Sequence, residues 1–265
     1  MFFEVPRFHA GGETVHATGF HEEWGGKGFN QAVAAARQGA DVSFLGKAGS
    51  EADAAAIEDF CKSEGVEPTI YFSKPADGPT ACAAIMTDGT GETRVTVARG
   101  AKLDAEDVEF GFKEAIAAAD ILLLNNEVPE EVNVRASEIA AANGVKIVFN
   151  PAPARPLPAT LAARVFLFTP NEFEEAALGE VAGEVVTTLG AAGCRIRSTG
   201  EVVPAPPAKA VDATGAGDTF TAVLAVRLAE GEPLRAACVA ANAAAAKSVE
   251  KKYVLPSLPR RMAYH

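Results

Sequence analysis

Residues 211–220, VDATGAGDTF, combine small residues and acids in an order that suits phosphate chemistry. Gly215, Ala216 and Gly217 lead directly into an apolar-periodic stretch that predicts a helix. Such a turn directs backbone N–H groups and the positive end of a helix dipole at one point, where an anion is stabilised. We expect Asp218, in the same turn, to accept the proton of a hydroxyl group that attacks a phosphate.

A structural role explains these residues when each is taken alone. Asp212, Thr214 and Asp218 are good helix N-caps, and glycine suits a tight turn. The complete order Asp-x-Thr-Gly-Ala-Gly-Asp is much harder to explain in that way, and it resembles the signature of the ribokinase-like (PfkB) carbohydrate kinase family. The resemblance implies that Asp218 is the catalytic base and that residues 215–217 form the anion hole. It also makes Asp212 and Thr214 candidates for a monovalent cation (K⁺) site.

A glycine-rich segment, residues 24–37 (WGGKGFNQAVAAAR), predicts a second ligand site. Gly25 and Gly26 let a ligand approach the backbone closely, and Lys27 and Asn30 offer donors for hydroxyl groups. The alanine-rich part predicts a helix. A glycine-rich turn before a helix is by itself also typical of a simple cap. This segment, however, is similar to the sugar-binding motif of ribokinases, which implies that these residues bind a sugar.

Two other nucleotide-binding motifs do not fit the glycine-rich segments. A Rossmann motif requires glycine where Gln31 stands, and no clear strand precedes it. A Walker loop requires Ser or Thr after Gly-Lys, but Gly28 follows Lys27 and Ala48 follows Lys47. Both motifs are therefore excluded.

Between the two motifs, short apolar runs alternate with helical patterns, which is typical of a parallel sheet covered on both faces. The predicted strands are residues 121–124, 145–149, 165–169 and 185–188, and the predicted helices are residues 52–64, 129–143, 218–230 and 233–250. The pattern and the resemblance both indicate an α/β fold with three layers around a doubly wound, mainly parallel sheet. In such sheets, ligands bind beyond the carboxyl ends of the strands.

Polar side chains follow several of these strands. Glu127 follows the first and Asn150 the second, although Asn-Pro pairs such as Asn150-Pro151 are also common in simple turns. Asn171 and Glu174 follow the third, where a helix start with acids in its first turn is the alternative. The resemblance implies that Glu127 holds the sugar, that Asn171 lies near the phosphates and that Glu174 positions Mg²⁺ through water. Mg²⁺ favours oxygen ligands and keeps several waters.

The loop after the fourth predicted strand, TTLGAAG from residue 187, is similar to the family's nucleotide loop. The resemblance implies that Thr188, Gly190 and Gly193 bind ATP. Asn242 matches a family position near the adenine, and an ordinary polar residue of a helix explains it equally well. The segment NPAPA, residues 150–154, resembles ribokinases in particular.

A small sheet is predicted from residues 80–86 and 93–98, which are rich in β-branched and small residues around a glycine turn. Residues 14–20 predict a further strand. In the family such a sheet is a lid over the sugar, and in ribokinases two lids clasp each other. The resemblance therefore implies a β lid from about residues 8–24 and 79–100, and a homodimer formed through it, which would also cover its edges.

Length, composition and charge narrow the classes of protein. The 265 residues are 48% hydrophobic, which predicts one main domain, residues 1–265, with the lid as an appendage. The net charge of −11 argues against nucleic acid or an anionic membrane as a partner. The sequence has no apolar run of transmembrane length and no secretory signal. Cys61, Cys82, Cys194 and Cys238 form no Cys-x-x-Cys pair, so we expect reduced thiols in a cytoplasmic protein.

Together with these residues, the resemblance implies an ATP-dependent sugar kinase that transfers the γ-phosphate of ATP to the primary hydroxyl of ribose. GGKGFN and NPAPA favour ribose. Residues 91–94 (GETR) and 100–102 (GAK) differ from the Gly-Glu-Asn-Arg and Gly-Ala-Asn of ribokinases, and residues 250–254 replace a glycine-containing loop that helps to bind the cation. A sister kinase for another sugar or a nucleoside, and a non-enzymatic sugar-binding relative, are the alternatives.

The resemblance also implies that the printed chain lacks segments. Family members begin with a core strand and an Asp that grips the sugar, whereas this chain starts just beyond the end of that strand. The connections at residues 178–184 and 251–254 are also short. Because a domain with about 5–15 kcal/mol of stability could hardly lose a central strand, we expect an intact mass clearly above 27.4 kDa.

Overall fold

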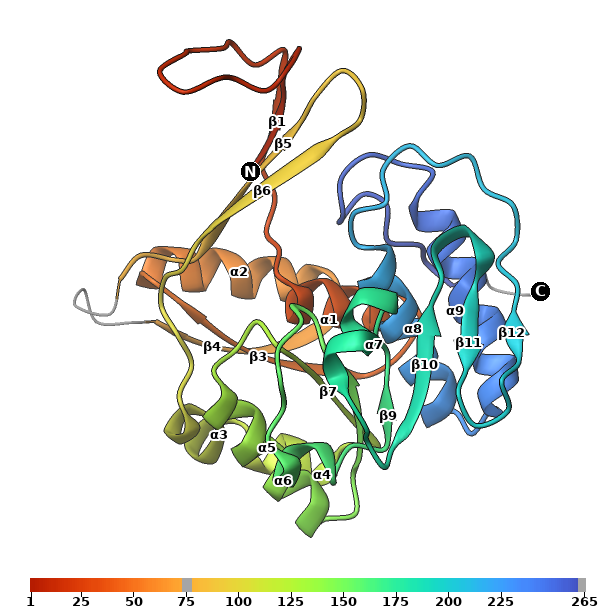
Figure 1. Cartoon of the computed structure of the whole chain (residues 1–265). Helices are drawn as coiled ribbons and strands as arrows, with labels where there is room; N and C mark the ends of the chain where they lie inside the picture. Colours follow the sequence, from red (N-terminus) through yellow and green to blue (C-terminus); the bar gives the residue numbers. More distant parts are fainter. Residues whose placement is uncertain (73–77, 262–265) are drawn as a thin grey trace. The chain divides into compact units, whose positions relative to one another are not determined.

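The computed structural model describes residues 1–72 and 78–261 (Figure 1). The chain divides into two units. The smaller unit comprises Met1–Trp24, Lys47–Ile57 and Ile70–Lys102, and the larger unit comprises Gly25–Gly46, Glu58–Thr69 and Leu103–His265. Both chemical motifs of the sequence belong to the larger unit, except for Trp24. The prediction of a single domain over residues 1–265 stays a prediction.

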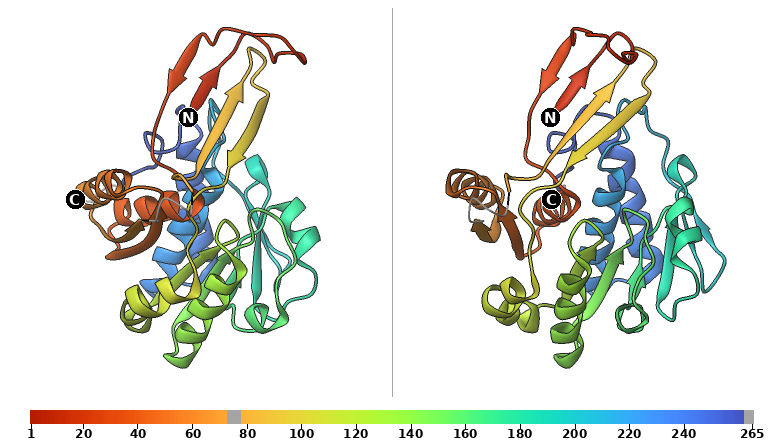
Figure 2. Two further views of the ribbon diagram at one scale, coloured as in Figure 1. Left: turned by 90° about the vertical axis from the view of Figure 1, so that its left-hand side faces the viewer. Right: turned by 60° about the vertical axis from the view of Figure 1, so that its left-hand side comes forward.

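The smaller unit contains a four-stranded sheet with the order β2-β1-β5-β6 (Figure 2). Its strands are β1 (Phe2–Glu4), β2 (Gly19–His21), β5 (Cys82–Thr87) and β6 (Thr93–Ala98). The predicted hairpin is confirmed, because β5 and β6 pair antiparallel. The Asp88 side chain accepts the backbone N–H groups of Thr90 and Glu92 and so closes the turn between them.

The predicted strand over residues 14–20 is wrong in its extent. Only Gly19–His21 pairs, and its partner is Phe2–Glu4. The residues before it form a loop in which the Glu13 carboxylate accepts hydrogen bonds from the Arg7 side chain and from the N–H of Ala10. Sequence patterns do not predict the strand Phe2–Glu4, because three residues are too few to establish a period. The sheet therefore begins before residue 8, where the lid was expected to start.

The larger unit is organised around a six-stranded sheet with the order β12-β11-β10-β9-β8-β7. Its strands are β7 (Ile121–Asn125), β8 (Lys146–Asn150), β9 (Leu167–Phe168), β10 (Glu184–Thr188), β11 (Cys194–Ile196) and β12 (Val202–Val203). The first four are parallel, and the last two add an antiparallel edge. All four predicted strands are present, so the mainly parallel α/β fold is confirmed.

Helices cover both faces of this sheet (Figures 1 and 2). One layer contains α1 (Lys27–Arg37), α8 (Ala216–Ala229) and α9 (Leu234–Ser248), which pack side by side. The other contains α3 (Ala105–Gly111), α4 (Lys113–Ala118), α5 (Glu130–Ala142), α6 (Ala159–Ala162) and α7 (Glu172–Leu178). The helices predicted over residues 129–143, 218–230 and 233–250 correspond to α5, α8 and α9, and each predicted start and end lies within two residues of the observed one. Pro129 and Pro233 precede α5 and α9 because proline is pre-organised for a helix start.

The helix α8 lies in the hydrophobic core and holds the first motif in place. Phe220 and Leu224 pack with Val148 and Leu167 of the sheet and with Ala241 of α9. A helix that is apolar all round is a buried helix. The first turn of α8 is therefore fixed by packing.

The remaining elements contain residues of both units. They are α2 (Glu51–Ser63) and a two-stranded sheet of β3 (Val42–Ala48) and β4 (Val66–Phe72). The predicted helix over residues 52–64 corresponds to α2. Within residues 1–72 and 78–261, no helix combines the length and apolar character that crossing a membrane requires.

Candidate active site

The turn before α8 has a backbone conformation that only glycine adopts readily. Gly215 is the N-cap of α8 at a φ of +79°, in the left-handed region. A Cβ atom there would lie 2.6 Å from Cγ1 of Val254, so a side chain also has no room. Asp212 fixes the preceding loop, because its Oδ1 accepts the N–H of Thr214 at 2.9 Å and its Oδ2 accepts the N–H of Tyr253 at 3.0 Å. The loop thus presents the N-terminus of α8 in one orientation.

The carboxylate of Asp218 is 4% exposed and is held by residues of α1. Asn30 donates from Nδ2 to Oδ2 at 2.9 Å, and Gln31 donates from Nε2 to Oδ1 at 3.0 Å. The Nζ of Lys27 lies 4.0 Å from Oδ1. Asn30 and Asp218 are 188 residues apart along the chain, so the two sequence motifs meet at this carboxylate. An oriented carboxylate of this kind is suited to accept a proton from a bound hydroxyl.

Glu127 lies beside the first turn of α1. Its Oε2 accepts the backbone N–H of Lys27 at 2.6 Å, and a Cβ on Gly26 would lie 3.5 Å from the same oxygen. Although part of the side chain reaches solvent, the surrounding protein desolvates the carboxyl and raises its pKa. The N–H and the charge of Lys27 lower this pKa, and the charge of Asp218 raises it further. The carboxyl of Glu127 is therefore close enough to the general-base candidate, Asp218, for their charges to interact.

A cavity of about 260 Å³ lies beyond the carboxyl ends of the strands in the larger unit. It is lined by Lys27, Asn150, Ala152, Thr169, Asn171, Glu174, Thr188, Ala213, Gly215 and Gly217. The cavity thus joins the α8 turn to residues predicted to bind phosphates and Mg²⁺. The backbone N–H of Ala216, predicted to be part of the anion hole, already has an acceptor within the protein, because it donates to the carbonyl oxygen of Ala213 at 3.2 Å.

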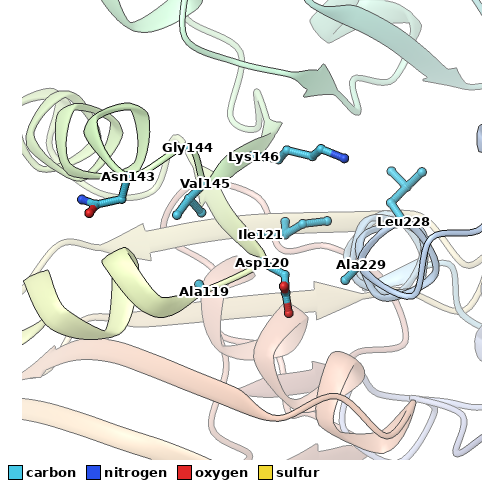
Figure 3. A pocket seen from close by; sticks show the side chains of 9 residues that line it. All are labelled: Ala119, Asp120, Ile121, Asn143, Gly144, Val145, Lys146, Leu228 and Ala229. Atoms are coloured by element: carbon cyan, nitrogen blue, oxygen red, sulfur yellow. The ribbon is translucent and has the colours of Figure 1, made fainter.

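A second cavity of about 260 Å³ lies near the amino ends of β7 and β8 and the end of α8 (Figure 3). It is lined by Ala119, Asp120, Ile121, Asn143, Gly144, Val145, Lys146, Leu228 and Ala229. Ligands of parallel sheets bind at the carboxyl ends of the strands. The cavity beside Gly215 and Asp218 is therefore the candidate active site, although the two have the same volume.

The polar residues at the start of α7 cap this helix, which is the structural alternative given above for Asn171 and Glu174. Asn171 and Glu174 form a capping box, in which Oδ1 of Asn171 accepts the N–H of Glu174 at 2.8 Å and Oε2 of Glu174 accepts the N–H of Asn171 at 2.9 Å. Thr188 donates its N–H to the carbonyl oxygen of Pro170 at 2.8 Å. All three predicted ligand residues nevertheless line the cavity, and their roles towards ATP and Mg²⁺ stay predictions.

Comparison with known proteins decides the family. The family model described as pfkB family carbohydrate kinase matches residues 2–261. The chain is a pfkB-family carbohydrate kinase. The resemblance noted in the two motifs is thereby confirmed, and so is the assignment as an ATP-dependent sugar kinase.

Several proteins that are similar to this pfkB-family kinase in sequence or in structure are ribokinases. The ribokinase of Bacillus subtilis is 36% identical over 251 residues, which cover 90% of this chain and 85% of the relative. The crystal structure of ribokinase from Thermotoga maritima has a TM-score of 0.85 at 28% identity, covering 98% of this chain and 92% of that one. The Arabidopsis thaliana ribokinase complexed with ribose and ATP has a TM-score of 0.81 at 27% identity, covering 97% and 91%.

Three predicted nucleotide-binding residues of the pfkB-family kinase lie outside the residues that line the cavity. Gly190 begins a short 3₁₀ turn and Gly193 follows it, and a Cβ on Gly193 would lie 2.1 Å from the carbonyl oxygen of Val203. Asn242 is 3% exposed and donates from Nδ2 to that carbonyl at 2.9 Å and to Sγ of Cys194 at 3.5 Å. These contacts are structural, and the expected contacts with ATP stay predictions.

Sequence reasoning missed two residues of the site and gave a third no role. Gln31 contacts Asp218, and Thr169 lines the cavity. Asn150, which follows a predicted strand, lines the cavity as well. In the sequence, Gln31 and Thr169 differ from their neighbours only as polar residues in an apolar run, which does not indicate a functional role. For Gln31 that run is the alanine-rich helix α1, whose residues from Phe29 to Ala35 are all buried.

Proposed function

We propose that this kinase is a ribokinase, which transfers the γ-phosphate of ATP to the primary hydroxyl of ribose. The observation that carries the proposal is the buried carboxylate of Asp218, which binds Asn30 of the sugar motif and stands at the N-terminus of α8 beside the cavity. The similarity to the ribokinase of Bacillus subtilis and to the Arabidopsis thaliana ribokinase complexed with ribose and ATP supports it.

In the proposed mechanism, the sugar lies against Gly25, Gly26, Lys27, Asn30 and Glu127, and the γ-phosphate of ATP lies at the N-terminus of α8. Asp218 takes the proton of the primary hydroxyl, whose oxygen attacks the γ-phosphorus. The bond from that phosphorus to the bridging oxygen breaks, and ADP leaves. Phosphoryl transfer depends mainly on positioning and electrostatic stabilisation. The fixed carboxylate and the helix N-terminus supply both.

Mg²⁺ is proposed as the cofactor, held by Glu174 through water. The residue fits this role, because Glu174 lines the cavity and Mg²⁺ prefers oxygen ligands. When bound, the ion neutralises negative charge on the phosphates. Asp212 and Thr214 are proposed for K⁺, but both Asp212 oxygens already accept backbone N–H groups. We therefore assign no step to K⁺.

We further propose that the four-stranded sheet of the smaller unit is the lid and that two lids pair in a homodimer. Three large apolar side chains of this sheet are exposed, namely Phe20 (59%), Val95 (57%) and Val97 (62%). Exposed apolar groups on a small sheet favour pairing with a second copy.

We also propose a cytoplasmic location for this kinase. Its four cysteines are free, which is typical of proteins in a reducing compartment.

The test of the function is an assay of ADP release with ribose, other pentoses, hexoses and nucleosides as acceptors. We expect the highest kcat/KM with ribose. A higher kcat/KM with another sugar or a nucleoside would identify a sister kinase. That alternative exists because Thr93 and Lys102 stand at positions where ribokinases usually have Asn. Absence of ADP release with every acceptor would identify a non-enzymatic relative.

Removing side chains from the proposed sugar site should weaken the sugar selectively. Asn30→Ala and Glu127→Ala are each expected to raise KM for ribose on the order of tenfold or more, because polar contacts are lost. KM for ATP should stay within about twofold of the wild-type value. The measurement is steady-state kinetics with each substrate varied.

The matched control for the sugar-site variants is Glu131→Ala, which removes an exposed acid from the first turn of α5. It should leave both KM values unchanged. Equal weakening of ribose and ATP, or loss of folding in the site variants, would instead assign Asn30 and Glu127 a structural role.

The pH dependence of sugar binding should follow Glu127. Only the ionised carboxylate is a full acceptor for hydroxyl groups, and its raised pKa means that protonation begins at a higher pH than for an ordinary glutamate. KM for ribose at saturating ATP is therefore expected to rise as the pH falls through the raised pKa. Glu127→Gln should remove this rise; a rise that persists in Glu127→Gln would exclude Glu127 as its source.

A further inference from the structure

Gln31 connects the proposed base to the carboxyl ends of two strands. Its Nε2 lies 3.0 Å from Oδ1 of Asp218 and 3.4 Å from Oδ1 of Asn150. Asn150 in turn donates from Nδ2 to the carbonyl oxygen of Thr169 at 2.9 Å. A continuous chain of hydrogen bonds therefore runs from α8 through α1 to the ends of β8 and β9. Its last two members line the cavity.

Gln31 itself lies behind this site. The residue is 1% exposed and does not belong to the residues that line the cavity. Both Nε2 hydrogens of the amide have acceptors, one on Asp218 and one on Asn150. The orientation of the amide is thus fixed, and any effect of Gln31 on the reaction passes through those two residues.

The same amide is unfavourable for the fold. Its Oε1 is buried and has no hydrogen-bond partner within residues 1–72 and 78–261. A buried acceptor without a partner destabilises the folded state, and an apolar side chain of the same length avoids that loss. Packing alone therefore gives no reason for glutamine at this position, whereas its bond to Asp218 does.

Asn30, on the same turn of α1, differs from Gln31 in one respect. Its Nδ2 also holds the carboxylate, but its unpartnered Oδ1 lies near Gly25, where a Cβ would be 3.9 Å away. Asn30 is placed to contact a sugar as well as Asp218. Gln31 has no such place beside the sugar, and its bonds are to Asp218 and, at 3.4 Å, to Asn150. Because Asn150 keeps its bond to the carbonyl of Thr169, the loss of Gln31 should affect kcat and leave both KM values unchanged.

We propose that Gln31 is a positioning residue for phosphoryl transfer, which locks the carboxylate of Asp218 in the orientation that accepts the hydroxyl proton. The inference rests on the proposed role of Asp218 as the base. Because a small misplacement of a reacting group lowers the rate strongly, we expect Gln31→Met to reduce kcat by roughly 10- to 100-fold. KM for ribose and for ATP should stay within about twofold.

Gln38→Met is the matched control. Gln38 stands at the other end of α1, is 4% exposed, and donates from Nε2 to the carbonyl oxygen of Pro259 at 2.9 Å. Both variants remove a buried amide from the same helix, but only Gln31 touches Asp218. Thermal unfolding of both variants is measured alongside kcat. An equal loss of kcat in the two variants would overturn the proposal.

A double-mutant cycle with Asp218→Asn distinguishes the possible failures. If Gln31 acts through the carboxylate, Gln31→Met should have no further effect on kcat in the Asp218→Asn background. An equal effect in both backgrounds would overturn the inference while the base remains. Full activity of Asp218→Asn alone would instead overturn the role of Asp218 as the base, on which the inference rests, while the ADP-release assay tests the proposed function separately.

A second variant covers the case in which Gln31→Met does not fold. Gln31→Leu also removes both N–H donors and leaves no polar atom at the buried position. It is expected to fold and to lose at least as much kcat as the methionine variant was predicted to lose. Unfolding of both variants would overturn the proposal, because Gln31 would then be required for the fold.

Discussion

Asp218→Asn is expected to reduce kcat by at least about 10²-fold and up to about 10⁴-fold. The amide cannot take the proton of the attacking hydroxyl, and its NH₂ group competes with the donors Asn30 and Gln31 that hold the carboxylate. The binding of ATP should remain largely intact, because Asp218 does not line the cavity. Steady-state kinetics and calorimetric titration with ATP measure the two effects.

The control for this variant is Asp120→Asn, which changes an acid of the second cavity, at the amino end of β7 (Figure 3). We expect normal kcat. Near-normal kcat in Asp218→Asn would remove Asp218 from the mechanism, and a loss in Asp120→Asn would show that the removal of an acid acts nonspecifically.

Gly215→Ala should have the second-largest effect. A non-glycine residue in the left-handed region costs about 1–2 kcal/mol, and the new Cβ would meet Val254 at 2.6 Å. The turn must then shift, which displaces the backbone donors of the proposed anion hole. The loss of one such donor lowers kcat on the order of 10²- to 10³-fold. We expect a loss of this size, with KM for ribose largely retained.

Gly231→Ala separates backbone strain from catalysis. Gly231 has a φ of +84°, lies between α8 and α9, and has open space where a Cβ would be added. Its alanine variant should lose thermal stability and keep kcat. If Gly215→Ala retained full kcat, the α8 turn would have no role in anion binding.

Local patterns were sufficient to predict much of the larger unit. The helix α8 begins where a glycine turn meets a long apolar run, and the parallel strands are short apolar runs between helices. The strand Phe2–Glu4 and the extent of Gly19–His21 depend on pairing with each other and with the hairpin. Such pairing is non-local, so no sequence period near residue 14 could indicate where the strand begins.

The candidate site was predictable where a motif supplied several residues in order. Asp218, Asn30 and Lys27 belong to two such motifs, and the structure brings them together. Gln31 has no signal of this kind, because a lone polar residue in a buried helix reveals its partner only in three dimensions. Asn242 is the opposite case, since its helical position is compatible both with a ligand and with the internal acceptor at Val203.

The bond between Asn30 and Asp218 also determines when the proposed catalytic centre can form during folding. Its two residues are 188 positions apart, and the turn at Gly215 packs against Val254, which is farther along the chain. Contacts between such distant segments form late, because the intervening chain must first be ordered. On the ribosome, the proposed proton acceptor would remain unassembled until the C-terminal segment has emerged. Enzymatic activity therefore reports the completion of the larger unit, and a partly folded chain would be inactive.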